Sequence, residues 1–185
     1  MEKSDITRRD VEAKLSSVGD YVKMDYLQQC LKKQLDFDTR KFVLGKLSAI
    51  YEDKKMFLEA GKLLRASAEI NVTFDGKMND FMKSVELFIQ AGAFDESDAT
   101  FSKALACGTD LQKGALKSKR KEMYKKQAEE FIKKDKRKHA MITYEKILEI
   151  DQISPDEKKM AQNALLGLYE KLGKVKEYGN LRRVM

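Results

Sequence analysis

Few side chains in this sequence have the types and the spacing that catalysis requires. His139 is the single histidine, and it lies in a basic run at the predicted start of a helix, where we expect a solvated side chain. Cys30 and Cys107 are far apart and belong to no CxxC or Cys/His cluster. The sequence also has no phosphate-binding glycine loop, zinc-protease motif, nucleophile elbow or calcium-binding loop. We therefore predict no enzymatic activity, no cofactor and no metal site.

The two cysteines and the polar amino terminus bear on the compartment. Both cysteines sit among apolar neighbours, which is typical of reduced core residues in the cytosol. Residues 1–9 contain no apolar stretch of the kind found in a signal peptide, and nowhere do about 18 apolar residues run together. We expect a cytoplasmic protein that does not insert into membranes.

The chemistry that the sequence does offer is electrostatic. The formal net charge is +7, and residues 113–138 alone hold 12 basic and 4 acidic residues. Such a segment can neutralise phosphates of RNA or DNA without reading sequence, can attract an acidic protein, or can be only a solvated face. Its two aromatic residues, Tyr124 and Phe131, both stand at predicted core positions, so no surface for base stacking is evident. The candidate basic patch consists of Lys117, Lys119, Arg120, Lys121, Lys133, Lys134, Lys136, Arg137 and Lys138.

Short helices joined by tight turns must position these groups. Apolar residues recur at helical spacing over 42–51, a polar turn follows at 52–55, and a second helical pattern runs over 57–64. The same arrangement returns around 81–88 and 94–105, and twice more downstream. Ser154, Pro155 and Glu157 form a capping box that predicts a helix start. Gly92, Gly108 and Gly173 stand where helices are expected to stop, because glycine can adopt the left-handed conformation without a side-chain clash.

Aligning these helical pairs reveals a repeat. With copies that start at Lys41, Met78, Lys121 and Lys159, large aromatic residues fall in one column and mostly small residues in another. The eleventh position holds Tyr51, Phe88, Phe131 and Tyr169. The twentieth position holds Ala60, Ser97, Ala140 and Tyr178. The twenty-fourth position holds Leu64, Phe101, Tyr144 and Arg182. Apolar stripes are core in any helical bundle, but a simple bundle does not predict recurrence at a fixed offset from each turn.

This pattern over residues 41–185 resembles the tetratricopeptide repeat, in which a large residue stands at position eleven, a small one at twenty and a large one at twenty-four. The starts lie 37, 43 and 38 residues apart instead of the family's 34, and hairpins of this length are also similar to the soluble NSF attachment protein class of solenoids. The resemblance implies an all-α fold of stacked helical hairpins that form a short right-handed superhelix. We expect a single domain over 1–185, with a divergent helical pair in 1–40 and about four degenerate repeats in 41–185.

The resemblance also implies a function. In that family the first helices of successive repeats line a concave groove, and positions two, five, six, nine, twelve and thirteen face the ligand. The predicted partner-binding residues at such positions are Lys46, Asn79, Lys83, Lys125, Lys126 and Asn163. Because lysine recurs at position six, we predict an interaction scaffold or adaptor that binds an acidic peptide or helix. The alternative is a nucleic-acid- or ribosome-associated protein that uses residues 113–138. The family's clamp for carboxyl-terminal peptides is not matched, because Gly45 and Ala49 replace its polar residues.

The last predicted helix, over 175–185, carries one further expectation. It ends in Leu181, Val184 and Met185 with no further element to cover them. Solenoids normally finish with a polar capping helix. We therefore expect that a partner or a second copy covers this face, which makes a homodimer through this helix a hypothesis.

Overall fold

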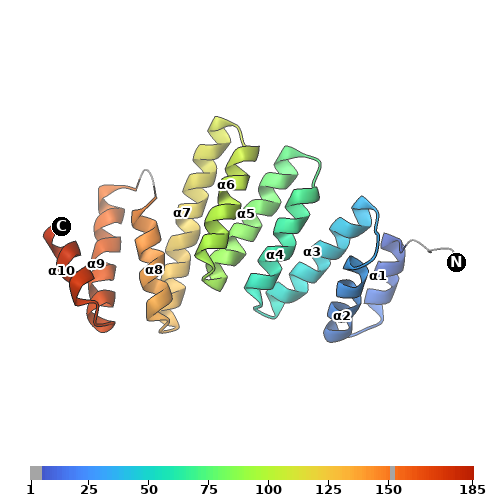
Figure 1. Ribbon diagram of the computed structural model, residues 1–185, viewed down its shortest axis with the longest axis horizontal. Coiled ribbons are helices and arrows are strands. Elements are labelled where there is room, and N and C mark those ends of the chain that lie inside the picture. Colours follow the sequence, from blue (N-terminus) through green and yellow to red (C-terminus); the bar gives the residue numbers. More distant parts are fainter. Residues whose placement is uncertain (1–5, 151–152) are drawn as a thin grey trace. The chain divides into compact units, whose positions relative to one another are not determined.

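The computed structural model describes residues 6–150 and 153–185, and these residues form ten α-helices and no strand (Figure 1). The helices are α1 (Arg8–Ser16), α2 (Asp20–Leu31), α3 (Phe37–Asp53), α4 (Phe57–Ile70), α5 (Phe74–Ala91), α6 (Phe94–Cys107), α7 (Asp110–Lys133), α8 (Arg137–Leu148), α9 (Pro155–Lys171) and α10 (Val175–Arg183). The predicted all-α class is confirmed.

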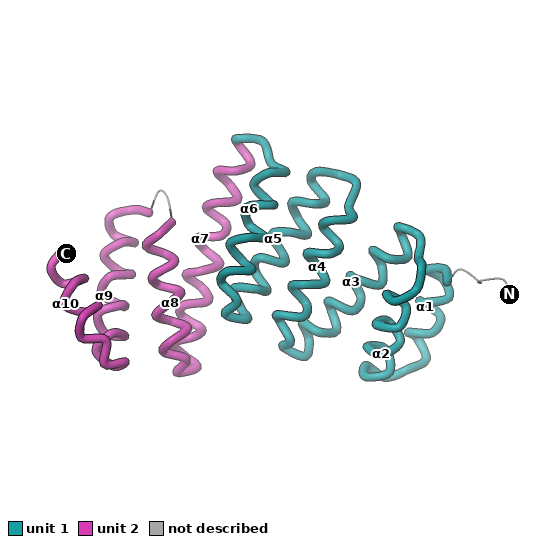
Figure 2. Tube along the Cα trace, in the orientation of Figure 1, with its two compact units in different colours: residues 1–110 teal, residues 111–185 magenta. Residues whose placement is uncertain are grey.

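The chain divides into two compact units (Figure 2). Unit 1 spans residues 1–110 and holds α1 to α6, and unit 2 spans residues 111–185 and holds nearly all of α7 together with α8 to α10. The boundary falls between the second and the third predicted repeat. The single domain expected over 1–185 stays a prediction.

Within unit 1, each helix from α2 to α6 packs against its neighbour in sequence, and α1 packs against α3. The amino-terminal pair, predicted without a repeat signature, is part of this core. Val11 of α1 and Leu27 of α2 are fully buried with Val43 and Leu47 of α3. Because α1 is fixed against α3 in this way, its first turn is held beside the exposed face of α3.

The four predicted hairpins share one turn geometry. In each of them the carbonyl of the aromatic residue at position eleven accepts a hydrogen bond from the amide five residues later, at 2.8, 2.9, 2.8 and 2.8 Å. These bonds join Met56 to Tyr51, Ala93 to Phe88, Lys136 to Phe131 and Lys174 to Tyr169. They are the long-range bonds of a Schellman motif, in which the residue before the donor adopts a left-handed conformation. The repeat inferred from the aromatic column is therefore confirmed by the backbone.

The left-handed residues of the four turns are of two kinds. Gly92 and Gly173 have φ values of 74° and 67°, as glycine permits. Lys55 and Asp135 occupy the equivalent positions with φ values of 60° and 52°, which is strained for residues with a side chain. The predicted left-handed stops at the two glycines are confirmed.

The third helix end is also found where it was expected, but without the left-handed conformation. Gly108 caps α6 in an extended conformation, with φ −97° and ψ 152°. The physical reason is its place in the chain, because Gly108 lies between two hairpins and not inside one. Asn71, which follows α4 at the equivalent junction, is extended in the same way, with ψ 139°.

The predicted columns point into the core. All four aromatic residues at position eleven are buried, and Ala60, Ser97 and Ala140 at position twenty are fully buried. The fourth repeat departs from the pattern, since Tyr178 is half-buried and Arg182 is exposed. The Ser154 capping box is confirmed and begins α9.

Irregular spacing between the repeats has a structural cause. α3, α5 and α9 are 17, 18 and 17 residues long, and each begins four residues before the position-one residue of the alignment. α7 is 24 residues long and begins 11 residues before Lys121. The longest interval between copies therefore comes from extra turns at the start of α7, whereas the hairpin turns remain alike.

Candidate functional site: a cationic pocket on α3

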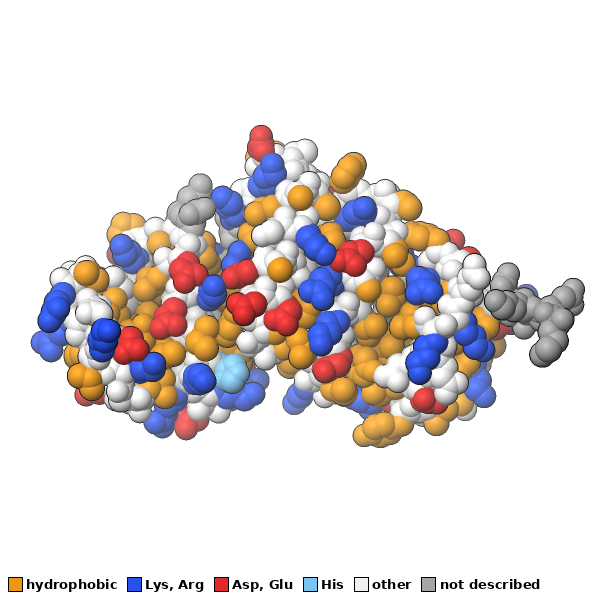
Figure 3. Space-filling view, viewed as in Figure 1, with side chains coloured by type: hydrophobic (Ala, Val, Ile, Leu, Met, Phe, Trp, Pro, Cys, Tyr) orange, Lys and Arg blue, Asp and Glu red, His pale blue; other side chains and the backbone are white. Residues whose placement is uncertain are grey.

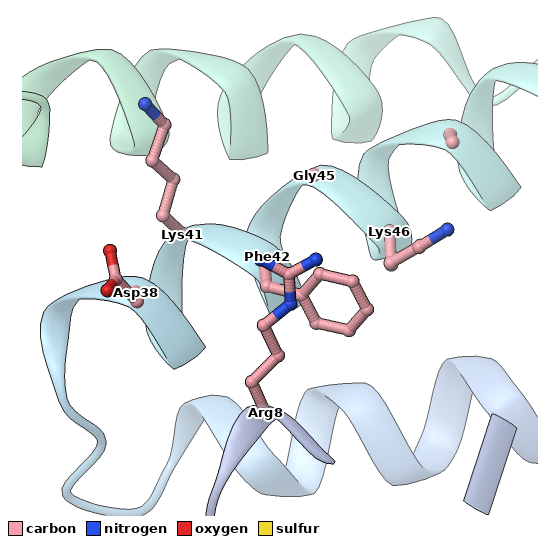
Figure 4. Close-up of a pocket in the computed structure, with 7 residues that line it drawn as sticks. Arg8, Asp38, Lys41, Phe42, Gly45 and Lys46 are labelled. Atoms are coloured by element: carbon pink, nitrogen blue, oxygen red, sulfur yellow. The ribbon is translucent and has the colours of Figure 1, made fainter. Parts of the chain in front are cut away.

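Unit 1 has a pocket of about 470 Å³ on the exposed face of α3. Arg8 of α1 lines it together with six residues of α3, which are Asp38, Lys41, Phe42, Gly45, Lys46 and Ala49 (Figure 4). A second hollow of about 510 Å³ shares Arg8, Phe42, Lys46 and Ala49 and continues toward Leu15 and Ile50. We call the first of these the α3 pocket.

Two helix starts position its rim. The Thr7 side chain and Asp10 form a capping box at the start of α1, which places Arg8 in the first turn of that helix. Asp36 accepts hydrogen bonds from the amide and the hydroxyl of Thr39, at 2.9 and 2.5 Å, and so starts α3. These bonds hold the pKa of Asp10 and that of Asp36 below their usual values. Both caps are therefore made by charged carboxylates at neutral pH.

Phe42 is the centre of the pocket. The guanidinium carbon of Arg8 lies 4.6 Å from the centroid of the Phe42 ring, and Lys46 Nζ lies 5.5 Å from it. Figure 4 shows Arg8 reaching across from α1 to this ring. Each cation–π contact is worth about 0.5–1 kcal/mol at an exposed site. Arg8 is held further by Glu12, whose carboxylate lies 2.9 Å from Arg8 Nε.

The floor of the pocket is apolar and open. A Cβ added at Gly45 would meet nothing within 4 Å, so the absence of a side chain there leaves space beside Phe42. Three cations, from Arg8, Lys41 and Lys46, line the pocket together with the carboxylate of Asp38, and Arg8 is also paired with Glu12. The arrangement suits a ligand that places an apolar group on Phe42 and an anionic group against the rim.

Four of the lining residues stand at positions of the repeat that the sequence resemblance assigns to a groove. Phe42, Gly45, Lys46 and Ala49 occupy positions two, five, six and nine. Among the described residues no carboxylate lies within ion-pair distance of Lys46, and its side chain is exposed. Lys46 is thus a predicted binding residue that lines the α3 pocket.

The other predicted residues of unit 1 have different surroundings. Asn79 is exposed on α5. Lys83 is partly buried and ion-paired with Glu52 of α3 at 2.8 Å and with Glu86 at 3.4 Å. Burial opposes the charged form of Lys83, but the hydrogen bond to Glu52 and the neighbouring carboxylates raise its pKa above the usual value. At position six of the repeat, the lysine of the second copy, Lys83, is therefore neutralised by carboxylates of the protein itself.

In unit 2 a single carboxylate joins two lysines of α7 to the start of α9. Glu157 accepts hydrogen bonds from Lys125 and, at 3.0 Å, from Lys121. The bond from Lys125 is the main reason why the pKa of Glu157 lies well below its usual value, and the same bond raises the pKa of Lys125. Lys126 and Asn163, the other residues predicted here, are exposed. Lys121 and Lys125 thus tie α7 to the start of α9.

The remaining members of the predicted basic patch are spread along α7 and its turn into α8. Lys133 and Lys134 lie 3.2 and 3.5 Å from Glu130, and Arg137 lies 2.7 Å from Asp135. Lys119, Lys136 and Lys138 are exposed, whereas Lys117 and Arg120 are half-buried. The guanidinium of Arg120 lies 5.2 Å from the ring of Tyr124, which is itself buried. The patch is therefore densest at the α7–α8 turn.

Sequence reasoning missed Arg8, Lys41 and Phe42 as site residues. Phe42 stands at groove position two of the first repeat, so the alignment held a signal for it, but its place in an apolar stripe favoured the core. Nothing local marks Arg8, because its contact with Phe42 joins residues 34 positions apart.

The structure also shows the surroundings of the histidine and the two cysteines, for which we predicted no catalytic or metal-binding role. His139 is exposed, and its ring lies 5.2 Å from that of Phe131. Cys30 is buried and Cys107 half-buried, and both are free thiols. Among the described residues no three His, Cys, Asp or Glu side chains are grouped so that they could hold a metal ion. None of the described helices has the length and apolarity needed to cross a bilayer.

The consecutive helical pairs and their four equivalent turns define a helical-repeat fold of the tetratricopeptide-like kind. No protein-family model matches the chain, and no curated protein matches it. Solved structures similar to it include the TPR domain of P58(IPK), with 15% identity and a TM-score of 0.45 over 94% of this chain. Another is BtubC (BKLC) from P. vanneervenii, with 13% identity and a TM-score of 0.39 over 93% of this chain and 74% of that one. The chain spans about half (48%) of the P58(IPK) domain.

Proposed function

We propose that this protein is an interaction scaffold whose α3 pocket receives an acidic segment of another protein. The observation that carries the proposal is the cationic rim of this pocket, which consists of Arg8, Lys41 and Lys46. Arg8 and Lys46 lie over the Phe42 ring; Arg8 is ion-paired with Glu12, whereas Lys46 has no carboxylate partner among the described residues. A carboxylate of the ligand pairs with this rim, and a neighbouring apolar side chain packs on the ring. The groove positions occupied by Phe42, Gly45, Lys46 and Ala49 support the same assignment.

The ligand lies across α3 and does not follow the full column of predicted lysines. Lys83 already has Glu52 and Glu86 as partners, and Lys125 already has Glu157. A ligand carboxylate has to displace those partners, whereas Lys46 is open to it. A non-catalytic role in the cytoplasm completes the proposal, and the free thiols of Cys30 and Cys107 support a reducing compartment.

A peptide library tests the pocket. One library holds peptides with a central aromatic or aliphatic residue flanked by Asp and Glu, and a matched library replaces the acidic residues by Lys and Arg. We expect selection from the acidic library alone. The tightest peptide is then titrated by fluorescence polarisation against variants of the pocket.

Two variants change the pocket and one serves as a control. Lys46→Glu reverses the rim charge and is expected to weaken binding about tenfold or more. Gly45→Gln fills the open floor, where a Cβ has no neighbour within 4 Å, and is expected to weaken binding while α3 remains helical. Lys62→Glu makes the same charge change on an exposed part of α4 outside the pocket. Equal binding by all three variants would refute the assignment.

The predicted alternative is nucleic-acid binding through residues 113–138. Lys121 and Lys125 are engaged with Glu157, which removes part of that positive surface from competition for phosphates. Salt-dependent binding of unrelated RNAs, abolished by charge reversal at Lys119, Lys126 and Lys138, would favour this alternative.

A homodimer through α10 is a separate proposal about assembly. α10 ends at Arg183, two residues before the predicted end, and Val184 and Met185 follow it with 75% and 52% of their surface exposed. They offer an apolar surface at this end of the helix. Sedimentation at high micromolar concentration tests it, and a monomer under those conditions removes it.

A further inference from the structure

The two hairpin turns of unit 2 lie on one edge of that unit. α8 begins at the first turn, α9 ends at the second, and the two helices pack against each other. Figure 1 shows the α7–α8 turn and the α9–α10 turn at the same end of the helices. We call this surface the turn edge.

The turn edge is strongly basic and fully accessible. Its eight basic residues, all exposed, are Lys133, Lys134, Lys136, Arg137, Lys138, Lys171, Lys174 and Lys176. Four acidic residues, Glu130, Asp135, Glu170 and Glu177, reduce the net charge to +4. Figure 3 shows basic side chains along this edge, with acidic and hydrophobic side chains among them. The equivalent turn of the second repeat, at residues 91–96, carries no basic residue, so the charge is not a requirement of the turn.

Exposed aliphatic side chains interrupt the basic residues. Ile132 immediately precedes Lys133 and is 46% exposed, and Val175 stands between Lys174 and Lys176 and is 80% exposed. An aliphatic side chain offers no face on which a nucleic-acid base can stack. It does gain free energy in the interfacial region of a bilayer, where basic residues are attracted to anionic headgroups.

We propose that the turn edge is a peripheral docking surface for an anionic phospholipid membrane. The lysines supply attraction to the headgroups, and Ile132 and Val175 enter the interfacial region without any helix crossing the bilayer. This surface is distinct from the α3 pocket, and the proposal does not depend on the proposed function. Several lysines act together, each worth about a factor of five in affinity near an anionic surface.

Co-sedimentation of the full chain with lipid vesicles tests the proposal. Vesicles of phosphatidylcholine with phosphatidylserine are compared with vesicles of phosphatidylcholine alone, at low and at raised salt. We expect binding to the anionic vesicles only, and weaker binding at the higher salt concentration.

Two double variants change the net charge by the same amount. Lys138→Glu with Lys176→Glu reverses two charges on the turn edge, both in first helical turns where an acidic residue is favourable. Lys158→Glu with Lys159→Glu reverses two exposed charges near the opposite end of α9. We expect the first pair to weaken vesicle binding about 30-fold or more. The second pair is expected to change it little, and both proteins should melt like the wild type.

Three results would overturn the proposal. The first is no sedimentation of the wild type with anionic vesicles at low salt. The second is equal loss of binding in the two double variants, which would assign the effect to net charge alone. The third is binding to a structured RNA, measured under the same conditions, that exceeds vesicle binding and is lost in the turn-edge variant, which would assign the edge to nucleic acid.

Discussion

Gly61 of α4 lies directly against the ring of Phe88 in α5. A Cβ added to Gly61 would stand 2.8 Å from Cε1 and 2.9 Å from Cδ1 of that ring, closer than carbon atoms approach in folded proteins. The Ser84 hydroxyl of α5 donates a buried 2.7 Å hydrogen bond to the Gly61 carbonyl, a second contact between the same two helices. This contact joins the first repeat to the second.

Replacing Gly61 tests how tightly α4 and α5 pack. Gly61→Ala should lower the free energy of unfolding by about 1–3 kcal/mol, because Phe88 is fully buried and has no space to move. Gly45→Ala is the control, since its Cβ meets nothing within 4 Å and alanine should stabilise α3 by about 0.5–1 kcal/mol. Urea unfolding followed by circular dichroism measures both. Equal stability of the two variants would contradict the close crossing.

Lys55 offers a stabilising substitution. Its left-handed conformation, with φ 60°, is strained for a residue with a side chain. Lys55→Gly should raise the free energy of unfolding by about 1 kcal/mol, because the native conformation no longer carries that strain. Lys55→Ala removes the same side-chain charge but keeps the Cβ, so its stability should stay close to that of the wild type. A glycine variant no more stable than the alanine variant would show that this turn is not strained.

Glu157 predicts how stability depends on pH. Its pKa is lowered in the folded protein, so its contribution to stability is present above the ordinary value of 4.5 and is lost as the pH falls below it. Lys125, whose pKa is raised, contributes below 10.5 and loses that contribution as the pH rises further. Between these two pH values both groups are charged, and their ion pair contributes fully to stability.

Glu157→Gln isolates this contribution, because glutamine can still accept the bond from the Ser154 amide in the capping box. The variant should be less stable than the wild type at pH 7 and should approach it at pH 3. Thermal unfolding measures the stability of the wild type and of the variant at each pH. The effect of acid on the other carboxylates is the same in both proteins and cancels in the comparison. A stability gap that does not shrink on acidification would show that the ion pairs with Lys121 and Lys125 contribute nothing.

Charge reversal at Lys83 and at Lys46 compares a lysine that is ion-paired with one that has no carboxylate partner among the described residues. Lys83→Glu places a third carboxylate beside Glu52 and Glu86, and it should lower stability by about 0.5–1 kcal/mol, with a smaller effect at high salt. Lys46→Glu has no such carboxylates beside it and loses only the cation–π contact with Phe42, so it should lower stability by about 0.5 kcal/mol, with little dependence on salt. Denaturant unfolding at two salt concentrations distinguishes the variants. The reverse order of effects would be inconsistent with the contacts of Lys83.

The helices, their turns and the repeat could be predicted from the sequence because they depend on residues close together in the chain. A capping box joins Ser154 to Glu157, and each Schellman turn joins an aromatic residue to the amide five positions on. The burial of the aromatic column follows from that spacing, since every equivalent turn presents its aromatic residue to the same side. At Gly108 the predicted helix end is confirmed but the left-handed conformation is not found, since a glycine can end a helix in a left-handed or an extended conformation.

Only the tertiary structure decided which charged groups are available to a ligand. Lys46, Lys83 and Lys126 are alike in the sequence, but packing of α3 on its neighbours leaves Lys46 in a pocket and brings Glu52 to Lys83. Arg8 meets Phe42 across 34 residues, and Glu157 meets Lys121 across 36. The strength of such contacts depends on distances of a few ångströms between helices, and a pattern of residue types does not fix those distances.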